Sequence, residues 1–188
     1  MSEYSRSNAT FKNYAISLGI LVGIVLIMAF VVSTRSGEHI PTVDYRQDID
    51  VLGGAADYAV TAPSPELTEE GWTPTSSTLN VSGPVEWSVG FATADDSHAM
   101  LTQSDADPEQ VVADRVKEAE EAGTVAVGGR EWEHFDSEEW GALVLREDGV
   151  TVVVSGSAEL DELTHLAEGL ETRPAAAGGE DAEGTEAD

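Results

Sequence analysis

Residues Tyr14 to Val32 read YAISLGILVGIVLIMAFVV, a stretch that holds no charged residue and no proline. The hydrocarbon core of a bilayer is about 30 Å thick, and a helix needs about 20 apolar residues to cross it. Lipid offers the backbone no hydrogen bonds, so a segment that crosses it as a single span has to be helical. The sequence therefore predicts one transmembrane helix over residues 14–32, which anchors the rest of the chain to the membrane.

A cleaved signal peptide is the alternative interpretation of this stretch. The apolar part of a signal peptide runs for about 7–15 residues, which is shorter than residues 14–32. No cysteine follows the stretch, which excludes a lipoprotein anchor. We therefore favour an anchor that is not cleaved. Gly19 and Gly23 have the GxxxG spacing that allows two helices to approach closely, so a weak homodimer is a further expectation.

The orientation of this anchor rests on a small difference in charge. Arg6 and Lys12 precede the span, and Arg35 and Arg46 follow it, so the count of basic residues is almost balanced. The short N-terminal tail, whose only acid is Glu3, favours an N-terminus in the cytoplasm. We expect a single-pass protein of the cell membrane with its large domain outside.

The other parts of the chain follow from composition. Residues 1–13 form a short tail, 33–42 a tether, and 43–173 an extracytoplasmic domain with enough residues for its own core. Residues 174–188, PAAAGGEDAEGTEAD, contain no large apolar residue and are predicted to be a disordered acidic tail.

Charge and cysteine content exclude several classes of function. The formal net charge is −27, and because residues 1–36 carry +2, the remainder carries −29. A domain of that sign repels phosphate backbones, so nucleic acid is not an expected partner. The chain has no cysteine, so it has neither disulfides nor a thiol nucleophile.

Periodicity and turn residues predict an α+β domain with a mostly antiparallel sheet and helices packed on one face. Val85, Trp87, Val89 and Phe91 alternate with polar or small residues, which indicates a half-buried strand. Two short series of strands each end in a capped amphipathic helix. One helix begins at Asp107 and stops at Gly123, and the other is capped by Ser157 and carries Leu160, Leu163, Leu166 and Leu170 on one face. This order indicates either a duplicated strand-strand-strand-helix unit or a coincidence of common elements. Gly128-Gly129 and Asp148-Gly149 are predicted to form tight hairpin turns. The strands are expected at residues 58–62, 73–81, 85–92, 97–104, 124–127, 131–135, 141–146 and 150–155.

The soluble part resembles an uncharacterised family of actinobacterial membrane-anchored proteins, domain of unknown function 4245. The residues that carry the resemblance are Val43-Asp44-Tyr45, Gly71-Trp72, Trp87 to Phe91, Val127-Gly128-Gly129-Arg130-Glu131-Trp132 and Val152 to Gly156. The resemblance implies a single-pass membrane protein with an outward α+β domain. It implies no activity and no catalytic residues.

No set of residues predicts catalysis, a cofactor or a metal. His39, His98, His134 and His165 are not at metal-ligand spacing from one another. The sequence contains no GxSxG motif. Acidic residues are so numerous that pairs of them are not informative.

Three residues are candidates for an interaction site. Arg130 is one of few cations in an acidic domain, and Trp132 and Trp140 lie near it in the sequence as possible aromatic anchors. The alternative is an arginine paired with a carboxylate and tryptophans buried in the core.

Two functions follow as hypotheses. The first is a non-enzymatic interaction or scaffold module in the cell envelope, which binds another envelope protein through the sheet face that helices leave uncovered. The second is a cell-surface hydrolase that uses two carboxylates, for instance on glycans.

Overall fold

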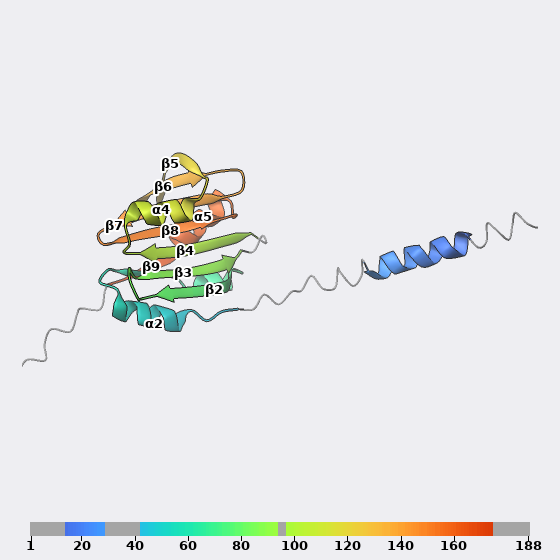
Figure 1. The fold of residues 1–188 in the computed structure, drawn as a ribbon, viewed down its shortest axis with the longest axis horizontal. Coiled ribbons are helices and arrows are strands. Elements are labelled where there is room, and N and C mark those ends of the chain that lie inside the picture. The colour runs from blue at the N-terminus through green and yellow to red at the C-terminus, as the bar shows by residue number, and fades with distance from the viewer. Residues whose placement is uncertain (1–13, 29–41, 94–96, 175–188) are drawn as a thin grey trace, which may run out of the picture. The chain divides into compact units, whose positions relative to one another are not determined.

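The computed structural model of the chain describes residues 14–28, 42–93 and 97–174. These belong to two units, Met1–Ile40 and Pro41–Asp188, and each is described by itself (Figure 1).

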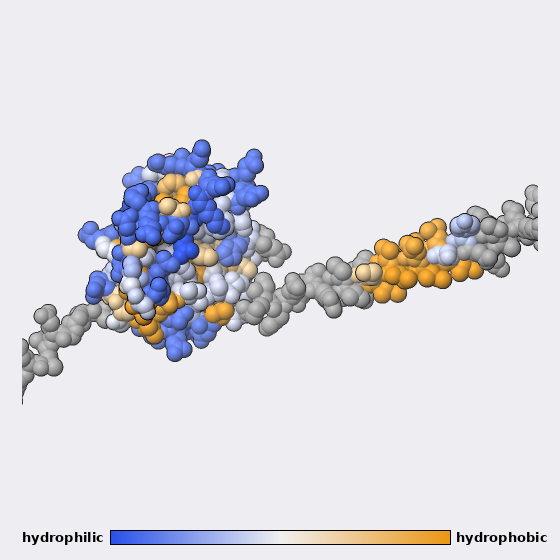
Figure 2. All heavy atoms as spheres, viewed as in Figure 1, coloured by the Kyte–Doolittle hydropathy of each residue, from blue (hydrophilic) through white to orange (hydrophobic). Residues whose placement is uncertain are grey.

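The first unit contains one described helix, residues 14–28. Its large apolar side chains are exposed around the helix, for example Ile16 at 55 % and Met28 at 63 %. Figure 2 shows the hydrophobic surface that these side chains form. The rest of the predicted span, residues 29–32, lies outside the described residues.

Within residues 14–28, 42–93 and 97–174, no helix has the length and apolar character needed to cross a membrane.

The second unit is an α+β body. Its elements are α2 (Arg46–Ala55), β1 (Val60–Pro63), α3 (Glu66–Glu69), β2 (Thr73–Asn80), β3 (Glu86–Ala92), β4 (His98–Ser104), α4 (Pro108–Val116), β5 (Glu120–Val127), β6 (Arg130–Asp136), β7 (Gly141–Glu147), β8 (Val150–Gly156), α5 (Leu160–Glu168) and β9 (Leu170–Arg173).

Seven of the strands form one antiparallel sheet in the order β2-β3-β4-β8-β7-β6-β5. The chain builds it from two meanders, β2 to β4 and β5 to β8, whose last strands pair with each other in the middle of the sheet. Strands β1 and β9, from the two ends of the body, form a separate two-stranded sheet. The prediction of a mostly antiparallel α+β fold is therefore confirmed.

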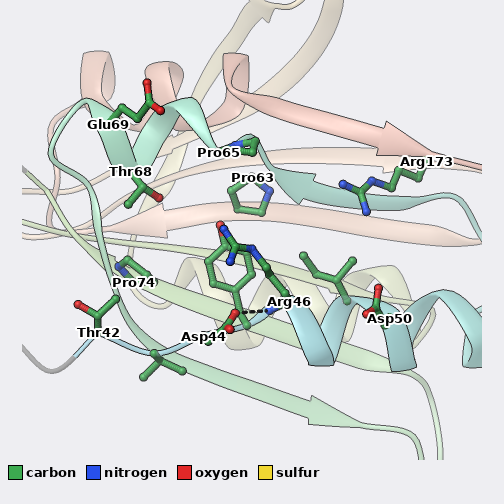
Figure 3. Close-up of a pocket in the computed structure, with 13 residues that line it drawn as sticks. Thr42, Asp44, Arg46, Asp50, Pro63, Pro65, Thr68, Glu69, Pro74 and Arg173 are labelled. Atoms are coloured by element: carbon green, nitrogen blue, oxygen red, sulfur yellow. Dashed lines mark hydrogen bonds between the residues drawn. The ribbon is translucent and has the colours of Figure 1, made fainter.

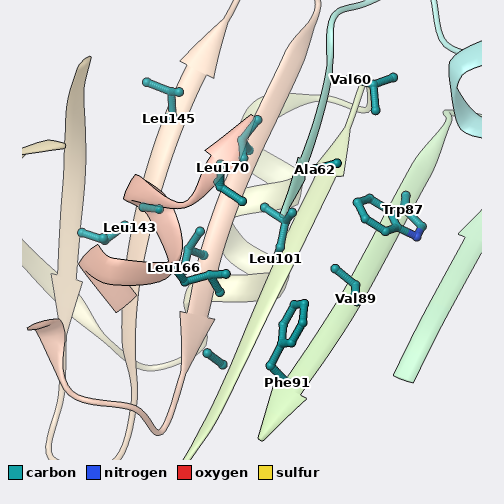
Figure 4. Close-up of a cluster of buried hydrophobic side chains, with 14 of the residues drawn as sticks. Val60, Ala62, Trp87, Val89, Phe91, Leu101, Leu143, Leu145, Leu166 and Leu170 are labelled. Carbon is teal, nitrogen blue, oxygen red and sulfur yellow. The ribbon is translucent and has the colours of Figure 1, made fainter. Parts of the chain in front are cut away.

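The main core lies on one face of the sheet. Trp87, Val89, Leu101 and Val152 project from that face and are fully buried. The cover comes from α2, α3, α5 and the β1–β9 pair, which contribute Ile49, Leu52, Val60, Ala62, Leu67, Leu163, Leu166, Ala167 and Leu170 to the cluster. Figure 4 shows Leu166 of α5 and Leu170 of β9 over the strands of the sheet.

The prediction that the helices pack on one face is wrong. Helix α4 packs on the opposite face, where Val111, Val112 and Val116 form a second cluster with Val144 and Val153. In Figure 1, α4 lies in front of the sheet and α5 behind it. The reason is that residues Ala142, Val144 and Val153 alternate with those of the main core, so β7 and β8 bury side chains on both faces.

Helices α4 and α5 lie on opposite faces of the sheet. A two-fold axis perpendicular to the sheet, which would relate β4 to its antiparallel neighbour β8, would place both helices on the same face. The repeated order is therefore not a two-fold symmetric pair of units in this sheet, and a duplicated strand-strand-strand-helix unit stays a prediction.

Several element ends differ from those predicted. Gly123 was expected to end the first long helix, but α4 ends at Val116, and Gly123 lies within β5. Ser157 was expected to cap α5, but its hydroxyl accepts a hydrogen bond from His98 N at 3.2 Å. Helix α5 begins at Leu160, and a carboxylate oxygen of Glu162 accepts from the backbone N of Glu159 at 3.3 Å. Leu170, predicted on the helix, starts β9.

Candidate functional site: the groove beside helix α2

A groove of about 660 Å³ opens where the chain enters and leaves the body (Figure 3). Its walls come from the segment before α2, from α2 itself, from the β1–α3 connection, from Pro74 of β2, and from Arg173 at the end of β9. The pairing of β1 with β9 brings these distant segments together, with Val60 opposite Arg173 and Pro63 opposite Leu170. We call this feature the α2 groove.

The apolar part of the α2 groove is rigid. Pro63, Pro65, Pro74 and Ile49 line it, and all of these except Pro65 are buried. Proline has a fixed φ and no backbone N–H, so these residues hold their shape and offer no donor of their own.

Tyr45 also lines the groove and ties it to the core. Its ring packs at 6.0 Å from the rings of both Trp87 and Phe91. Burial raises the pKa of Tyr45, and the nearby charge of Arg46 opposes this in part. The hydroxyl therefore stays protonated at neutral pH and is available as a hydrogen-bond donor.

Charged side chains of both signs line the same groove. Arg46 and Arg173 are its cations, and Asp44, Asp50 and Glu69 are its anions. In Figure 3 the guanidinium groups of Arg46 and Arg173 are both directed toward the space beside Pro63. Asp50 lies four residues after Arg46 on α2, but within the described residues neither arginine forms an ion pair.

The other described cations of the body all have partners. Arg115 pairs with Glu86 at 2.6 Å, and Arg130 pairs with Glu147 at 3.3 Å.

Arg146 lies 2.9 Å from carboxylate oxygens of both Glu109 and Glu133. The ammonium group of Lys117 lies 3.1 Å from the centre of the Trp140 ring. Among the described residues, the two guanidinium groups that form no ion pair therefore both lie in the α2 groove.

The predicted interaction residues lie elsewhere, on the β5 side of the sheet. Arg130 is half-buried, and its guanidinium carbon is 5.8 Å from the centre of the Trp132 ring. Trp132 is fully buried in the main core, and its Nε1 has no hydrogen-bond partner among the described residues. Trp132 and His134 pair with Val125 and Gly123 of β5 and share one face of β6.

Trp140 lies apart from this pair. Its Nε1 donates to the backbone carbonyl of Arg115 at 3.0 Å, and its ring contacts Lys117. It lines a second, smaller groove of about 200 Å³ together with Glu138, Glu139 and Glu159. The three residues thus do not form one surface, and an interaction role for Arg130, Trp132 and Trp140 stays a prediction.

Sequence reasoning passed over Arg46 and Arg173 as a pair. They are separated by almost the whole body, and only the β1–β9 pairing joins them. The available signal was the scarcity of cations, which made each one informative. That signal was applied to Arg130, whose partner Glu147 follows from a cross-strand register that the sequence does not show.

The described residues give little support to metal or carboxylate chemistry. In residues 14–28, 42–93 and 97–174, no group of three or more potential ligands is placed to hold a metal ion. The carboxylate of Asp107 caps helix α4, where it accepts hydrogen bonds from Glu109 N at 3.1 Å and Gln110 N at 3.2 Å. The three carboxylates of the α2 groove are all exposed to water, whereas a general acid at neutral pH needs a carboxyl group withdrawn from it.

The structure thus defines an α+β protein with a mostly antiparallel sheet and a groove of mixed polarity. The chain belongs to the family described as protein of unknown function (DUF4245), whose family model matches residues 6–170. No curated protein and no solved structure matches the chain significantly.

Proposed function

We propose that this is a single-pass membrane protein of the cell envelope whose outward domain is a non-enzymatic binding module, with the α2 groove as its ligand site. The N-terminus lies in the cytoplasm, and the partner is another envelope component. The observation that carries the proposal is a pair of arginines in the α2 groove, Arg46 and Arg173, that form no ion pair with any described residue.

The helix at residues 14–28 supports the membrane anchor. A helix that is apolar on all sides needs apolar surroundings, which a bilayer supplies. Its described large side chains, from Tyr14 to Met28, are 47–74 % exposed. The family match begins at residue 6, so it includes the predicted span of residues 14–32 together with the body.

The charge balance of the body supports a binding role for the groove. Arginine is ordinarily paired when acids are plentiful, as Arg115, Arg130 and Arg146 are here. A guanidinium group has a fixed set of donors that suits a carboxylate or a phosphate. Arg46 and Arg173 form no ion pair with any described residue, so both can bind an anionic group of a ligand in the groove.

The uncovered part of the sheet is the competing surface. Beyond the edge of α4, the face of β2 to β4 opposite the main core carries Ser76, Thr78, Ser88 and Met100. Ser88 and Thr102 satisfy each other by a hydrogen bond of 2.9 Å. This face lacks the aromatic anchors and unpaired charges that mark a strong contact site, so it is less favoured than the groove.

A carboxylate-dependent hydrolase is likewise less favoured. It requires two carboxyl groups that face each other, one of them kept protonated by its surroundings. The exposed positions of Asp44, Asp50 and Glu69 supply no such surroundings.

Site-specific photocrosslinking in cells that make the full chain tests the proposal. A photoreactive residue at Thr68 lines the α2 groove, and the matched control at Thr78 lies on the uncovered sheet face. We expect adducts from Thr68 that are lost in the Arg46→Gln, Arg173→Gln double variant. Adducts from Thr78 alone would contradict the choice of site.

Protease treatment of spheroplasts tests the orientation. The body should be cut from outside while the N-terminal tail is protected. Protection of the body would contradict an outward domain.

The anchor also provides for a weak homodimer. Gly19 and Gly23 have open space around them in the described helix. Replacing both by Ile should lower crosslinking between two tagged copies of the full chain. Unchanged crosslinking would contradict a dimer that forms through this face.

A further inference from the structure

We propose that the ligand of the α2 groove is zwitterionic: a short peptide whose free carboxylate binds Arg46 and Arg173 and whose amine binds Glu69. This inference rests on the proposed function and adds the chemical class of the ligand to it.

Arg46 and Arg173 would bind the anionic end of the ligand. Arg46 reaches the groove from the first turn of α2, and Arg173 reaches it from the last residue of β9. Both guanidinium groups are directed toward the space beside Pro63 (Figure 3). Planar donors converging from two segments suit a carboxylate, which accepts two parallel hydrogen bonds from each fork.

The carboxylates of the groove decide where the cationic end of the ligand can bind. Asp50 and Glu69 line the same groove, and within the described residues neither forms an ion pair. Asp44 is different, because its carboxylate accepts a hydrogen bond from Arg46 N at 3.1 Å. Figure 3 shows Glu69 and Asp50 on opposite sides of Pro63, so one amine does not reach both carboxylates. A simple anion would bind the arginines and leave Glu69 without a partner among the described residues. A ligand with a carboxylate at one end and an amine at the other can bind the arginines and Glu69 together.

The surface between the charged groups would contact the middle of the ligand. The floor between the charged groups consists of Ile49, Pro63 and Pro74, which offer no side-chain donor or acceptor. Thr42 and Thr68 place hydroxyl groups at the rim, where they can bind backbone amides. The volume of about 660 Å³ lies within the range of small-molecule sites, about 300–1,000 Å³.

The overall charge argues against an anionic lipid as the source of the carboxylate or phosphate. Residues 37–188 carry −29, so an anionic membrane surface repels the body. A free, net-neutral peptide meets no such repulsion.

The test uses the full-length chain in nanodiscs of phosphatidylcholine, with tetraalanine as the probe. Three forms of the peptide are titrated by calorimetry: free termini, C-terminal amide and N-terminal acetyl. We expect the amide to bind at least about tenfold more weakly than the free peptide and the acetyl form at least about threefold more weakly.

Variants assign each loss to its end of the groove. In the Arg46→Gln, Arg173→Gln variant the free peptide and the amide should bind alike. In the Glu69→Gln variant the free and acetylated peptides should bind alike. Arg146→Gln is the matched control, since it removes one positive charge outside the groove and should leave all three affinities unchanged.

Three results would overturn the inference. They are equal binding of the free and amidated peptides, no binding of tetraalanine at millimolar concentration, and displacement of the peptide by 10 mM inorganic phosphate, on the order of the weakest affinities considered. Each leaves the proposed function standing if Thr68 still forms adducts in cells. Loss of those adducts would instead remove the groove as the binding site.

Discussion

Gly156 shows how closely two strands approach in this body. It lies opposite Ala99 of β4 and Gly141 of β7, in the centre of the sheet. A Cβ atom at Gly156 would lie 1.9 Å from the carbonyl oxygen of His98, which is a backbone atom with little freedom to move. The position therefore requires glycine for lack of space.

We expect Gly156→Ala to destabilise the body strongly. Overpacking of a core typically costs about 1–3 kcal/mol, and a backbone clash belongs at or above the upper end of that range. Urea unfolding of the full-length chain, followed by tryptophan fluorescence, measures the loss.

Gly53→Ala is the matched control for this change. Gly53 lies in α2, and a Cβ there meets no atom within 4 Å. Alanine in a helix interior is favoured over glycine by about 0.5–1 kcal/mol, so this variant should be more stable than the natural chain. A Gly156→Ala variant as stable as Gly53→Ala would contradict the predicted clash.

His98 makes the stability of the body depend on pH. Burial lowers the pKa of His98, and the charge of Lys117 lowers it further. In the unfolded chain the ring titrates near 6.5, so the unfolded state takes up the proton first as the pH falls. The contribution of neutral His98 is therefore complete above pH 6.5 and declines as the pH falls toward its folded-state pKa.

The His98→Gln variant should lose this part of the pH dependence. Comparison of its free energy of unfolding with that of the natural chain at about pH 7.5 and 5 measures the difference. A natural chain that gains stability relative to the variant on acidification would contradict the sign.

Replacing Lys117 by Gln separates the two causes of this lowered pKa. Removal of a nearby positive charge should raise the pKa of His98, but only in part, because burial is the larger cause. An NMR titration of the histidine rings measures the change. A lower pKa in the variant would exclude the charge effect.

Helix α4 depends on Asp107, the residue that caps its N-terminus. Asp107 accepts hydrogen bonds from Glu109 N and Gln110 N, and Pro108 occupies the first helical position. Asp107→Ala should cost about 1 kcal/mol of stability, and Asp107→Ser should retain most of it because serine also caps helices well. Equal stability of the two variants in urea unfolding would show that the cap is unimportant.

Elements whose signals are local could be predicted from the sequence. The alternation of Val85, Trp87 and Val89 correctly predicted a strand with one buried face. Gly128, Gly129 and Gly149 were correctly expected at tight hairpin turns, and all three have positive φ.

Elements whose type or position depends on distant parts of the chain could not be predicted from the sequence. Strand β9 continues the apolar pattern of α5 through Leu170, and it becomes a strand because β1 is there to pair with it. The face chosen by α4 depends on Ala142, Val144 and Val153, which follow it in the chain. The α2 groove depends on the same long-range pairing, so its two arginines could not be joined from the sequence.

The charge of the whole chain makes its stability depend on salt. Repulsion among the acids opposes the compact state, and salt screens it over about 3 Å at 1 M against more than 10 Å below 0.1 M. We expect NaCl raised from about 0.05 to 1 M to stabilise the chain on the order of 1 kcal/mol, which corresponds to about 2–4 °C in Tm.

Scanning calorimetry of the full-length chain checks this dependence. The same comparison near pH 3 is the control, because the protonated acids no longer repel one another and the effect of salt should shrink. A Tm that falls with salt at neutral pH would contradict the repulsion.

The order in which the strands enter the sheet has a consequence for biosynthesis. Strand β8 lies in the centre of the sheet, between β4 and β7, although nearly all of the body precedes it in the chain. Strand β1 pairs with β9, which is the last strand of the body to be synthesised. A ribosome or a translocation channel therefore delivers β2 to β4 well before their neighbour exists, and the body closes only when residue 173 has emerged.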